Sequence, residues 1–367
     1  GLWQELLAQL LKDYRKNPLN ERPRLTPAIA DVRRAVREGF AAAGLQAGDL
    51  VLVACSGGAD SLALAAAAAF EAPRYLSSRA DGDSETAGLR VGAIVIDHGM
   101  QPGSAEIAGE TAHKLSVLGL FPVEIRTVNV GTDGGPEAAA RAARYEAIDA
   151  VAEQTGANAV LLGHTLNDQA ETVLMGLARG SGGRSLNGMA YVSGTYLRPL
   201  LGITRETTEN FCADSGLEPW HDPMNKDVAY TRVRVRKNLL PALEAELGPG
   251  IAEALARTAE TLREDEEVLA ELALDAYKKV AKEKATRIDI GVEEFKALPL
   301  AIRHRLIALA AVVLQAPMLA RVHILAIDAL VDDWHGQKPL TLPGIRVERT
   351  GETIALHTTK TLKTGAC

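Results

Sequence analysis

Short apolar runs alternate with amphipathic stretches over the first two thirds of the chain. Four runs rich in Val, Leu and Ile predict buried β-strands, at Leu50–Ala54, Val91–Ile96, Val123–Val128 and Ala159–Leu162. Apolar residues at helical spacing predict one helix that starts at Thr26-Pro27. They predict four more over Leu62–Phe70, Ser104–Leu118, Pro136–Thr155 and Asp168–Leu177. This alternation is typical of an α/β fold, a doubly wound, mostly parallel, Rossmann-like sheet covered on both faces. Ligands of such sheets bind at the carboxyl ends of the strands, so a site is expected in the loops that follow them.

The pattern changes after Pro241. Helical periodicity extends over Ile251–Lys284 and Val292–Leu314 and returns at Arg321–Val331, and residues 340–357 read as short strands joined by turns. Residues 25–240 are therefore predicted to form the α/β domain, and residues 241–367 a smaller, mainly helical C-terminal domain with short terminal strands. Residues 1–24 are an N-terminal extension whose leucines recur at helical spacing, which favours a packing helix or a fusion remnant over a membrane anchor.

The length and charge of the chain limit the classes of function. A chain of 367 residues fits two or three domains, and its net charge of −7 argues against a surface coated in basic residues. A nucleic-acid partner would need a local basic patch. One candidate lies between residues 226 and 237, where five cations occur beside Trp220, His221 and Tyr230. The five cations are Lys226, Arg232, Arg234, Arg236 and Lys237. A solvated face explains the same pattern nearly as well.

The three cysteines, Cys55, Cys212 and Cys367, lie far apart in the sequence. This spacing excludes a disulfide framework and a cysteine zinc site and fits a reducing compartment. The sequence has no signal peptide and no uninterrupted apolar run of about 18 residues. A cytoplasmic protein without a membrane partner is therefore expected.

A glycine-rich loop follows the first predicted strand and precedes a helix. It has the sequence Ser56-Gly57-Gly58-Ala59-Asp60-Ser61. Two glycines let successive backbone N–H groups approach an anion, and the helix adds its positive N-terminal end. The serines supply hydroxyl donors, and Asp60 supplies a carboxylate for Mg²⁺ beside a phosphate. The spacing excludes a Walker A loop, and the alternative is a turn that binds nothing.

Two further strand ends carry polar residues. Asp97-His98-Gly99 ends the second strand, where it either contacts a nucleotide or forms a simple turn. Gly163-His164 follows the strand Ala159–Leu162, and Asp168, Glu171 and Thr172 then share one side of the next helix. Two carboxylates and a hydroxyl in this arrangement suit Mg²⁺ or a substrate ammonium. Ordinary capping of the helix N-terminus explains them equally well.

Two segments with arginines complete the set. Glu137, Arg141, Arg144 and Tyr145 fall on or near one helical face, although a solvated face with a Glu137–Arg141 pair is the simpler interpretation. The glycine-rich stretch 179–184 has an arginine at each end. It is either a loop that closes over phosphates or a surface connector.

The order of these segments is more specific than any one of them. Together with Leu186-Asn187-Gly188-Met189, Arg198-Pro199-Leu200-Leu201 and the stretch 220–225, they resemble the tRNA(Ile)-lysidine synthetase family of PP-loop enzymes over residues 25–245. A plausible helical continuation extends to about residue 335. One departure is Asn167, which stands where many relatives carry a second Asp, so a second metal ligand there is in doubt.

The resemblance implies a two-step reaction with ATP, Mg²⁺, free L-lysine and the tRNA(Ile) that has a CAU anticodon. Cytosine O2 of the wobble base attacks the α-phosphate, and the ε-amine of lysine then displaces AMP to give lysidine. A homodimer is possible.

The resemblance also implies roles for the residues of the motifs. The nucleotide site would comprise the loop, the Asp97-His98 turn and Gly163. Its loop residues are Ser56, Gly57, Gly58, Ala59, Asp60 and Ser61. Mg²⁺ would bind Asp60 and Asp168, and Glu171 or Asp168 would hold the lysine ammonium. His164 would accept a proton, and Arg141 and Arg179 would contact phosphate or the activated base.

Three other functions are weighed against this one. A tRNA thiolase of the same superfamily would want reactive or paired cysteines, and only Cys55 adjoins the loop. A nucleotide-binding or RNA-binding module without catalysis would not need Asp60, His164, Asp168 and Glu171 together. An amide-forming synthetase would need a source of ammonia, and no glutaminase motif is visible.

Overall fold

The fold is taken from a computed structural model that describes residues 25–76, 88–97, 99, 103–128, 136–180, 183–223 and 227–359. The chain forms two compact units, residues 1–175 with 188–256 and residues 176–187 with 257–367. This division falls later than the predicted boundary at residue 241, because Leu240 and Ala252 pack against Leu166 and Ala170 in a core of the first unit.

The first unit is built on a six-stranded sheet with the order β3-β2-β1-β4-β6-β5. All neighbouring strands are parallel except β5 and β6, which form an antiparallel hairpin. The strands are β1 Leu50–Cys55, β2 Arg90–Asp97, β3 Val123–Thr127, β4 Ala159–Leu162, β5 Val192–Ser193 and β6 Tyr196–Leu197. The predicted doubly wound parallel sheet is confirmed, and the short β5–β6 hairpin is the part that the pattern missed.

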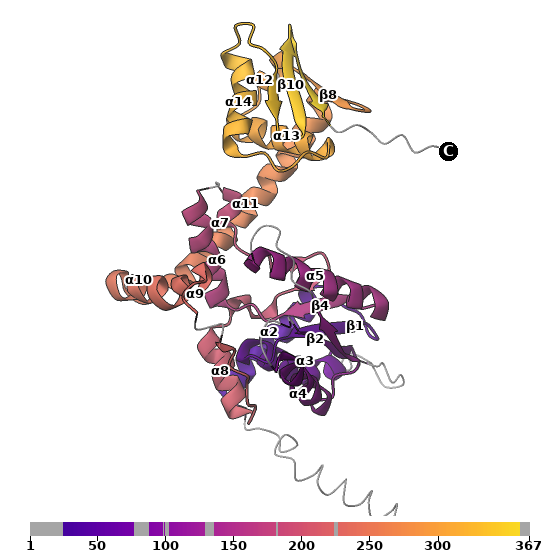
Figure 1. Ribbon diagram of the computed structural model, residues 1–367, viewed down its shortest axis with the longest axis vertical. Helices are drawn as coiled ribbons and strands as arrows, with labels where there is room; N and C mark the ends of the chain where they lie inside the picture. Colours follow the sequence, from indigo (N-terminus) through magenta and orange to yellow (C-terminus); the bar gives the residue numbers. More distant parts are fainter. Residues whose placement is uncertain are drawn as a thin grey trace, which may run out of the picture. The chain divides into compact units, whose positions relative to one another are not determined.

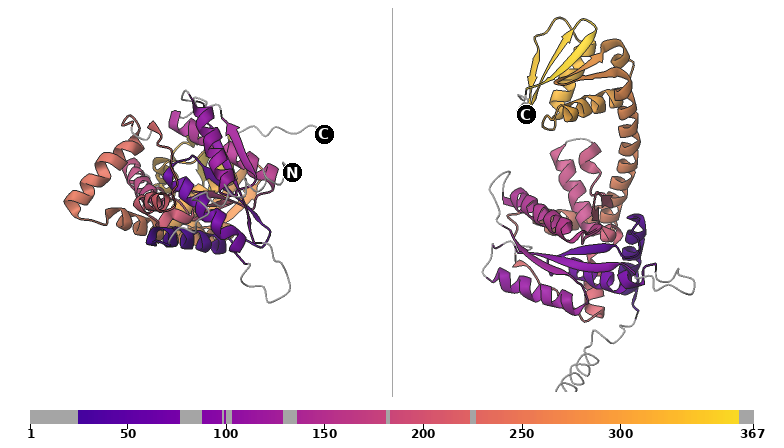
Figure 2. Two further views of the ribbon diagram at one scale, coloured as in Figure 1. Left: turned by 90° about the horizontal axis from the view of Figure 1, so that it is seen from below. Right: turned by 90° about the vertical axis from the view of Figure 1, so that its right-hand side faces the viewer.

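Helices cover both faces of this sheet (Figures 1 and 2). The helices between residues 27 and 247 are α2 Pro27–Ala42, α3 Ala59–Glu71, η1 Ala72–Arg74, α4 Ser104–Val117, α5 Pro136–Thr155, α6 Leu166–Arg179, η3 Pro199–Gly202, α8 Arg205–Asp214, α9 Thr231–Arg234, η5 Val235–Leu239 and α10 Leu240–Leu247. Alternate residues of β1 explain the two layers, because strand side chains point to opposite faces. Val51 and Val53 pack with α2, α3 and α4, whereas Leu50 and Leu52 pack with Ile148 of α5.

The predicted helix start at Thr26-Pro27 is confirmed. The Thr26 hydroxyl accepts a hydrogen bond from the backbone N–H of Ile29 over 3.4 Å, and Pro27 occupies the first helical position. Apolar residues at helical spacing in α2, from Ile29 to Phe40, are fully buried. Helix α3 begins at Ala59, three residues before the predicted Leu62, because the glycine loop leads directly into it.

The second unit has its own core and an antiparallel sheet with the order β7-β8-β11-β10-β9. Its strands are β7 Ala281–Lys284, β8 Arg287–Gly291, β9 Leu340–Leu342, β10 Ile345–Thr350 and β11 Thr353–Thr358. Its helices are α7 Gly183–Leu186, α12 Val292–Lys296, α13 Leu300–Val313 and α14 Arg321–Asp332, and α11 Ile251–Val280 enters it from the first unit.

Two of the predicted helices in this region are too long. The helix predicted over Ile251–Lys284 ends at Val280, because residues 281–284 pair with β8. The one predicted over Val292–Leu314 is interrupted, and Pro299 precedes the first residue of α13. The predicted terminal strands are present, but the sheet also takes in β7 and β8. No helix in the described ranges has the length and apolar character needed to cross a bilayer.

Candidate active site

The glycine loop between β1 and α3 has the conformation that its sequence requires. Gly57 has φ +84°, and a Cβ at this position would lie 2.7 Å from Thr111 Oγ1, so only glycine fits without strain. The backbone N–H of Trp220 donates a hydrogen bond to the carbonyl of Gly57 over 2.8 Å. Neighbouring elements therefore fix the loop from two sides.

Ser61 braces the loop from inside. Its hydroxyl accepts a hydrogen bond from the backbone N–H of Ser56 over 3.2 Å and donates one to the carbonyl of Gly58 over 3.1 Å. Gly58 is the N-cap of α3 and supplies no side-chain cap, so the first N–H groups of the described helix are free to meet an anion. The Ser61 hydroxyl therefore holds the loop, and the backbone N–H groups at the start of α3 are the donors that a phosphate would meet there.

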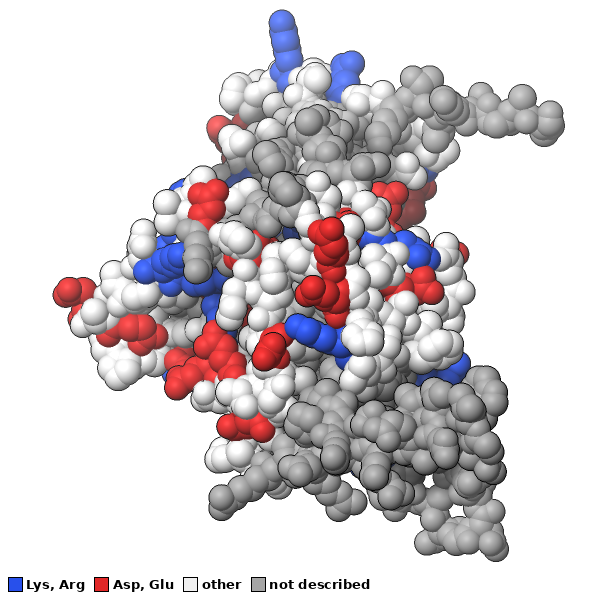
Figure 3. All heavy atoms as spheres, turned by 60° about the horizontal axis from the view of Figure 1, so that its bottom comes forward, with Lys and Arg blue, Asp and Glu red and all other residues white. Residues whose placement is uncertain are grey.

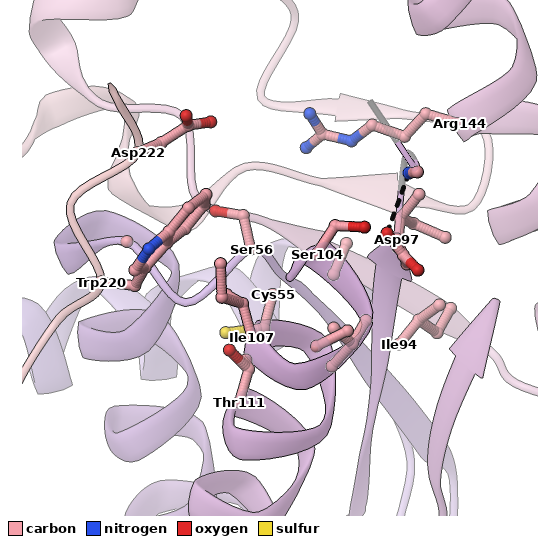
Figure 4. Close-up of a pocket in the computed structure, with 16 residues that line it drawn as sticks. Cys55, Ser56, Ile94, Asp97, Ser104, Ile107, Thr111, Arg144, Trp220 and Asp222 are labelled. Carbon is pink, nitrogen blue, oxygen red and sulfur yellow. Dashed lines mark hydrogen bonds between the residues drawn. The ribbon is translucent and has the colours of Figure 1, made fainter. Parts of the chain in front are cut away.

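A cavity of about 270 Å³ lies at the carboxyl ends of β1 and β2, beside this loop (Figure 4). Apolar side chains such as Ile94 and Ile107 line one part of it, and Ser56, Asp97 and Trp220 line another. The Asp97 carboxylate accepts a hydrogen bond from the backbone N–H of Gly99 over 2.9 Å, which shapes the turn after β2. His98 lies outside the described residues.

Arg144, and not Arg141, lines this cavity. Figure 4 shows the Arg144 guanidinium projecting into it from the side opposite Trp220 and Asp222. Arg144 makes no hydrogen bond or ion pair with another described residue, and burial lowers the pKa of its guanidinium. An unpaired, desolvated cation favours an anionic ligand. Arg141 is exposed and instead donates a hydrogen bond to the Tyr145 hydroxyl over 3.2 Å. Both arginines follow Glu137 on one helix, so the sequence alone did not separate them.

The predicted acids Asp60, Asp168 and Glu171 are brought together, and three arginines meet them. Arg236 Nε donates to Glu171 Oε1 over 2.7 Å, and Arg232 Nε donates to Glu171 Oε2 over 3.0 Å. Glu171 itself is fully buried. Three carboxylates therefore face three guanidiniums, the third being Arg205, and the charges balance.

Asp168 is the most completely bonded of the acids. One carboxylate oxygen accepts hydrogen bonds from the backbone N–H and the hydroxyl of Thr165, over 2.8 and 2.9 Å. The other accepts from Arg205 Nη2 over 3.0 Å. Burial by itself raises the pKa of Asp168, but Arg205 and the Thr165 N–H outweigh it and hold the pKa below its ordinary value. For Asp60, burial outweighs the Thr208 hydroxyl and Arg205, and the pKa is raised.

His164 and Gly163 lie where the strand β4 turns into α6. Gly163 packs against the backbone of Asp60 and Ser61, so that a Cβ would lie 3.1 Å from Ser61 Cα. Burial lowers the pKa of His164 well below its usual range, despite the nearby Asp168 carboxylate. Its Nδ1 is buried without a hydrogen-bond partner among the described residues. The imidazole is therefore neutral at physiological pH.

The two acids predicted to bind magnesium are already paired with a cation. No group of three or more His, Cys, Asp or Glu side chains in the described part of the chain is placed to hold a metal ion. The two predicted magnesium ligands, Asp60 and Asp168, are instead joined by the Arg205 guanidinium, at 3.5 and 3.0 Å. Asn167 stands where many relatives are expected to carry a second Asp. Its side chain accepts a hydrogen bond from the backbone N–H of Arg205 over 2.9 Å.

The arginines of the basic stretch 226–237 do not all face solvent. Arg232 and Arg236 point to the buried acids, and Arg234 donates hydrogen bonds to the carbonyls of Val228 and Ala229 over 2.8 and 2.7 Å. No sequence pattern indicates the inward direction of Arg232 and Arg236, because their carboxylate partner lies about 60 residues earlier. Over the described residues in Figure 3, acidic and basic side chains are interspersed.

Two candidates are not placed with the others. Arg179 ends α6 in the second unit, and the side chain of Glu137 lies outside the described residues. Their predicted roles stay predictions.

A parallel sheet with a glycine loop between its first strand and the next helix is the arrangement of nucleotide-binding α/β proteins. Residues 30–243 indeed match the PP-loop domain family, and residues 291–353 match the TilS substrate binding domain family. The chain belongs to the tRNA(Ile)-lysidine synthase family.

Membership rests on curated relatives that match most of the chain. The tRNA(Ile)-lysidine synthase of Leifsonia xyli is 56% identical over 85% of this chain and 91% of its own length. That of Thermobifida fusca is 51% identical over 87% of this chain and 94% of its own. Among solved structures, the U34-tRNA thiolase NcsA from Methanococcus maripaludis shares the fold, with a TM-score of 0.50 and 18% identity over 65% of this chain and 80% of its own.

Proposed function

We propose that the chain catalyses the ATP-dependent formation of lysidine at the wobble cytidine of tRNA(Ile) with a CAU anticodon, using free L-lysine. The observation that carries the proposal is the cavity at the edge of β1 and β2, beside the uncapped N-terminus of α3. Arg144 lines it and has no hydrogen-bond or ion-pair partner among the described residues, so both features suit a phosphate ligand. Membership of the family supplies the chemistry that such a site would perform.

In the first step, cytosine O2 attacks the α-phosphorus of ATP, and the bond from that phosphorus to the bridging oxygen breaks. Pyrophosphate leaves with the electron pair, and the base carries AMP on O2. The residues around Gly58 and Arg144 support this step, because backbone N–H groups and a guanidinium stabilise charge that moves onto the leaving pyrophosphate. Mg²⁺ belongs to the proposal as part of the nucleotide substrate, and no step is assigned to a resident metal.

In the second step, the ε-nitrogen of lysine attacks C2 of the base, the bond from C2 to O2 breaks, and AMP leaves with that oxygen. A lysine ε-ammonium has a pKa of about 10.4, so the site must remove a proton before attack. His164 is proposed for this role because its buried Nδ1 has no hydrogen-bond partner among the described residues. Burial lowers the pKa of the imidazole and so weakens it as a base, which means that proton transfer depends on the charges that surround it once lysine is bound. Asp168 and Glu171 are proposed to hold the ammonium, which would take the place of one guanidinium.

The experiment is nucleoside mass spectrometry of the tRNA after incubation with ATP and isotopically labelled lysine. Labelled lysidine should form only when ATP, lysine and the CAU tRNA are all present, with one pyrophosphate released for each lysidine. A control tRNA with the methionine identity and the same anticodon should stay unmodified. Absence of labelled nucleoside with a folded protein would refute the proposal.

The thiolase alternative is less well supported. Sulfur transfer needs a reactive thiolate, and both described cysteines, Cys55 and Cys212, are buried. Burial raises the pKa of each thiol, so both stay protonated at neutral pH.

A further inference from the structure

Arg205 is the cation that connects the glycine loop with the buried acids of α6. Its guanidinium lies 3.5 Å from Asp60 Oδ2, 3.0 Å from Asp168 Oδ1 and 3.6 Å from Glu171 Oε1. Arg232 and Arg236 form ion pairs with the α6 acids alone. Within the described residues, Arg205 is the one cation at ion-pair distance from Asp60.

The start of α8 fixes the backbone of Arg205. Thr204 is the N-cap of this helix and accepts a hydrogen bond from the N–H of Thr207 over 3.2 Å. The Asn167 side chain accepts from the N–H of Arg205, and the Thr208 hydroxyl, one turn later, donates to Asp60. The guanidinium is therefore held beside Asp60 by local structure, and its side chain is only 22% exposed.

The guanidinium lies between the carboxylates of Asp60 and Asp168, the two residues predicted from the sequence to bind Mg²⁺. Both a guanidinium and Mg²⁺ neutralise carboxylates, and the two cannot occupy the same space. With Arg205 in place the three acids already have three cations, so a free metal ion gains little there. A metal that arrives on a triphosphate brings phosphate oxygens as further ligands and can compete.

We propose that Arg205 is a positioning residue that acts through Asp60. It holds this carboxylate beside the glycine loop while the nucleotide is absent, and it keeps a free divalent cation out. The inference concerns the protein without nucleotide, and it rests on the proposed function only in that the glycine loop is the site of ATP.

The test is the thermal stability of Arg205→Met with and without Mg²⁺, in the absence of nucleotide. The wild type should show the same Tm at zero and at millimolar Mg²⁺. Arg205→Met leaves three carboxylates with two guanidiniums, so its Tm should be lower and should rise with Mg²⁺ by about 3 to 5 °C, as expected for a ligand at ten times its Kd. Adding Asp60→Asn should abolish the rise. Arg34→Met is the matched control, because Arg34 pairs with Asp31 on the surface of α2.

Two results would overturn the inference. One is that the Tm of the wild type rises with Mg²⁺ while the Tm of Asp60→Asn does not. The other is an Arg205→Met protein whose Tm does not respond to Mg²⁺. If Arg205→Met does not fold, the comparison of the wild type with Asp60→Asn still shows whether free Mg²⁺ binds while Arg205 is present. Arg205→Gln, a smaller change of polarity, then shows whether Mg²⁺ binds once the guanidinium is removed. None of these measurements uses tRNA or lysine, so their outcome is separate from the assay of lysidine formation.

Discussion

At the scale of single residues, the site is a set of buried charges that neutralise one another. Glu171 is fully buried and bonded to two arginines, and a buried carboxylate is stable only with such partners. The sequence identified the acids as a group but not their partners. This arrangement means that substitutions of the acids affect stability as well as chemistry.

Glu171→Gln should therefore destabilise the protein. The substitution leaves Arg232 without its carboxylate partner and Arg236 with Asp168 alone, and breaking a buried ion pair costs about 3 to 5 kcal/mol of unfolding free energy. Urea denaturation measures this loss. Glu153→Gln, on the exposed face of α5, should change stability by no more than about 0.5 kcal/mol. Equal stability of the two variants would contradict the ion-pair network.

His164 should make stability depend on pH. Its pKa is lowered in the folded protein, so the unfolded chain binds the proton more tightly. The contribution of His164 is complete above its unfolded pKa of about 6.5 and is lost as the pH falls below that value. The difference in unfolding free energy between wild type and His164→Asn should then change by about 1.4 kcal/mol per pH unit below pH 6. Parallel curves for the two proteins would show that His164 is not buried as described.

At the scale of elements, the loop between β1 and α3 positions the site because its backbone is fixed on both sides. Gly57 is held in the left-handed region between Thr111 of α4 and the strand end, and the N-terminus of α3 is left open. The five residues of η5, which follow α9 directly, form one turn of π-helix. Such turns are frequent at functional sites, and here Arg232 and Arg236, on either side of its start, reach the same carboxylate.

Gly57→Ala should weaken ATP binding by about tenfold or more. The added methyl group meets Thr111 Oγ1 in a conformation that L-residues rarely adopt, and relieving the strain moves the loop. Gly44→Ala is the matched control, because Gly44 also has a positive φ, +65°, but nothing lies within 4 Å of its Cβ position. Isothermal titration with ATP measures both. If Gly44→Ala weakens binding as much as Gly57→Ala, the close contact is not the cause.

At the scale of the whole molecule, two units with separate cores share one chain. The cavity, the glycine loop and the acid–arginine network are all made by residues of the first unit. The second unit has its own antiparallel sheet and its own buried cluster. Nucleotide binding is therefore expected to depend on the core of the first unit alone.

Ile307→Ala tests this separation. Ile307 is fully buried in the core of the second unit, and its truncation costs about 2 to 5 kcal/mol of the stability of that unit. ATP affinity should stay within about twofold of the wild type. For comparison, Leu161→Ala removes an equally buried side chain from β4 of the first unit, and it should lower ATP affinity as well as stability. Loss of ATP binding in Ile307→Ala would refute the independence of the units.

The elements of the first unit were largely predictable, because buried strands and amphipathic helices are local patterns. The predicted bounds of α5 and β4 agree with the structure at both ends. Strands β7 and β8 were missed because residues 281–284, Ala-Lys-Glu-Lys, show no alternation and directly follow a helical pattern, and the alternation in Arg287–Gly291 covers only five residues. Their pairing with each other and with β11 is a tertiary property.

The sequence by itself determined the α/β fold, the glycine loop and the gathering of chemistry at the carboxyl ends of the strands, since each depends on local pattern and on the geometry of parallel sheets. Only the tertiary structure decided that Arg144 enters the cavity while Arg141 faces solvent, and that Arg205, Arg232 and Arg236 neutralise the buried acids. The reason is that these contacts join residues about 40 to 150 positions apart or depend on small rotations about one helix axis. Residue types and spacing carry no information about either.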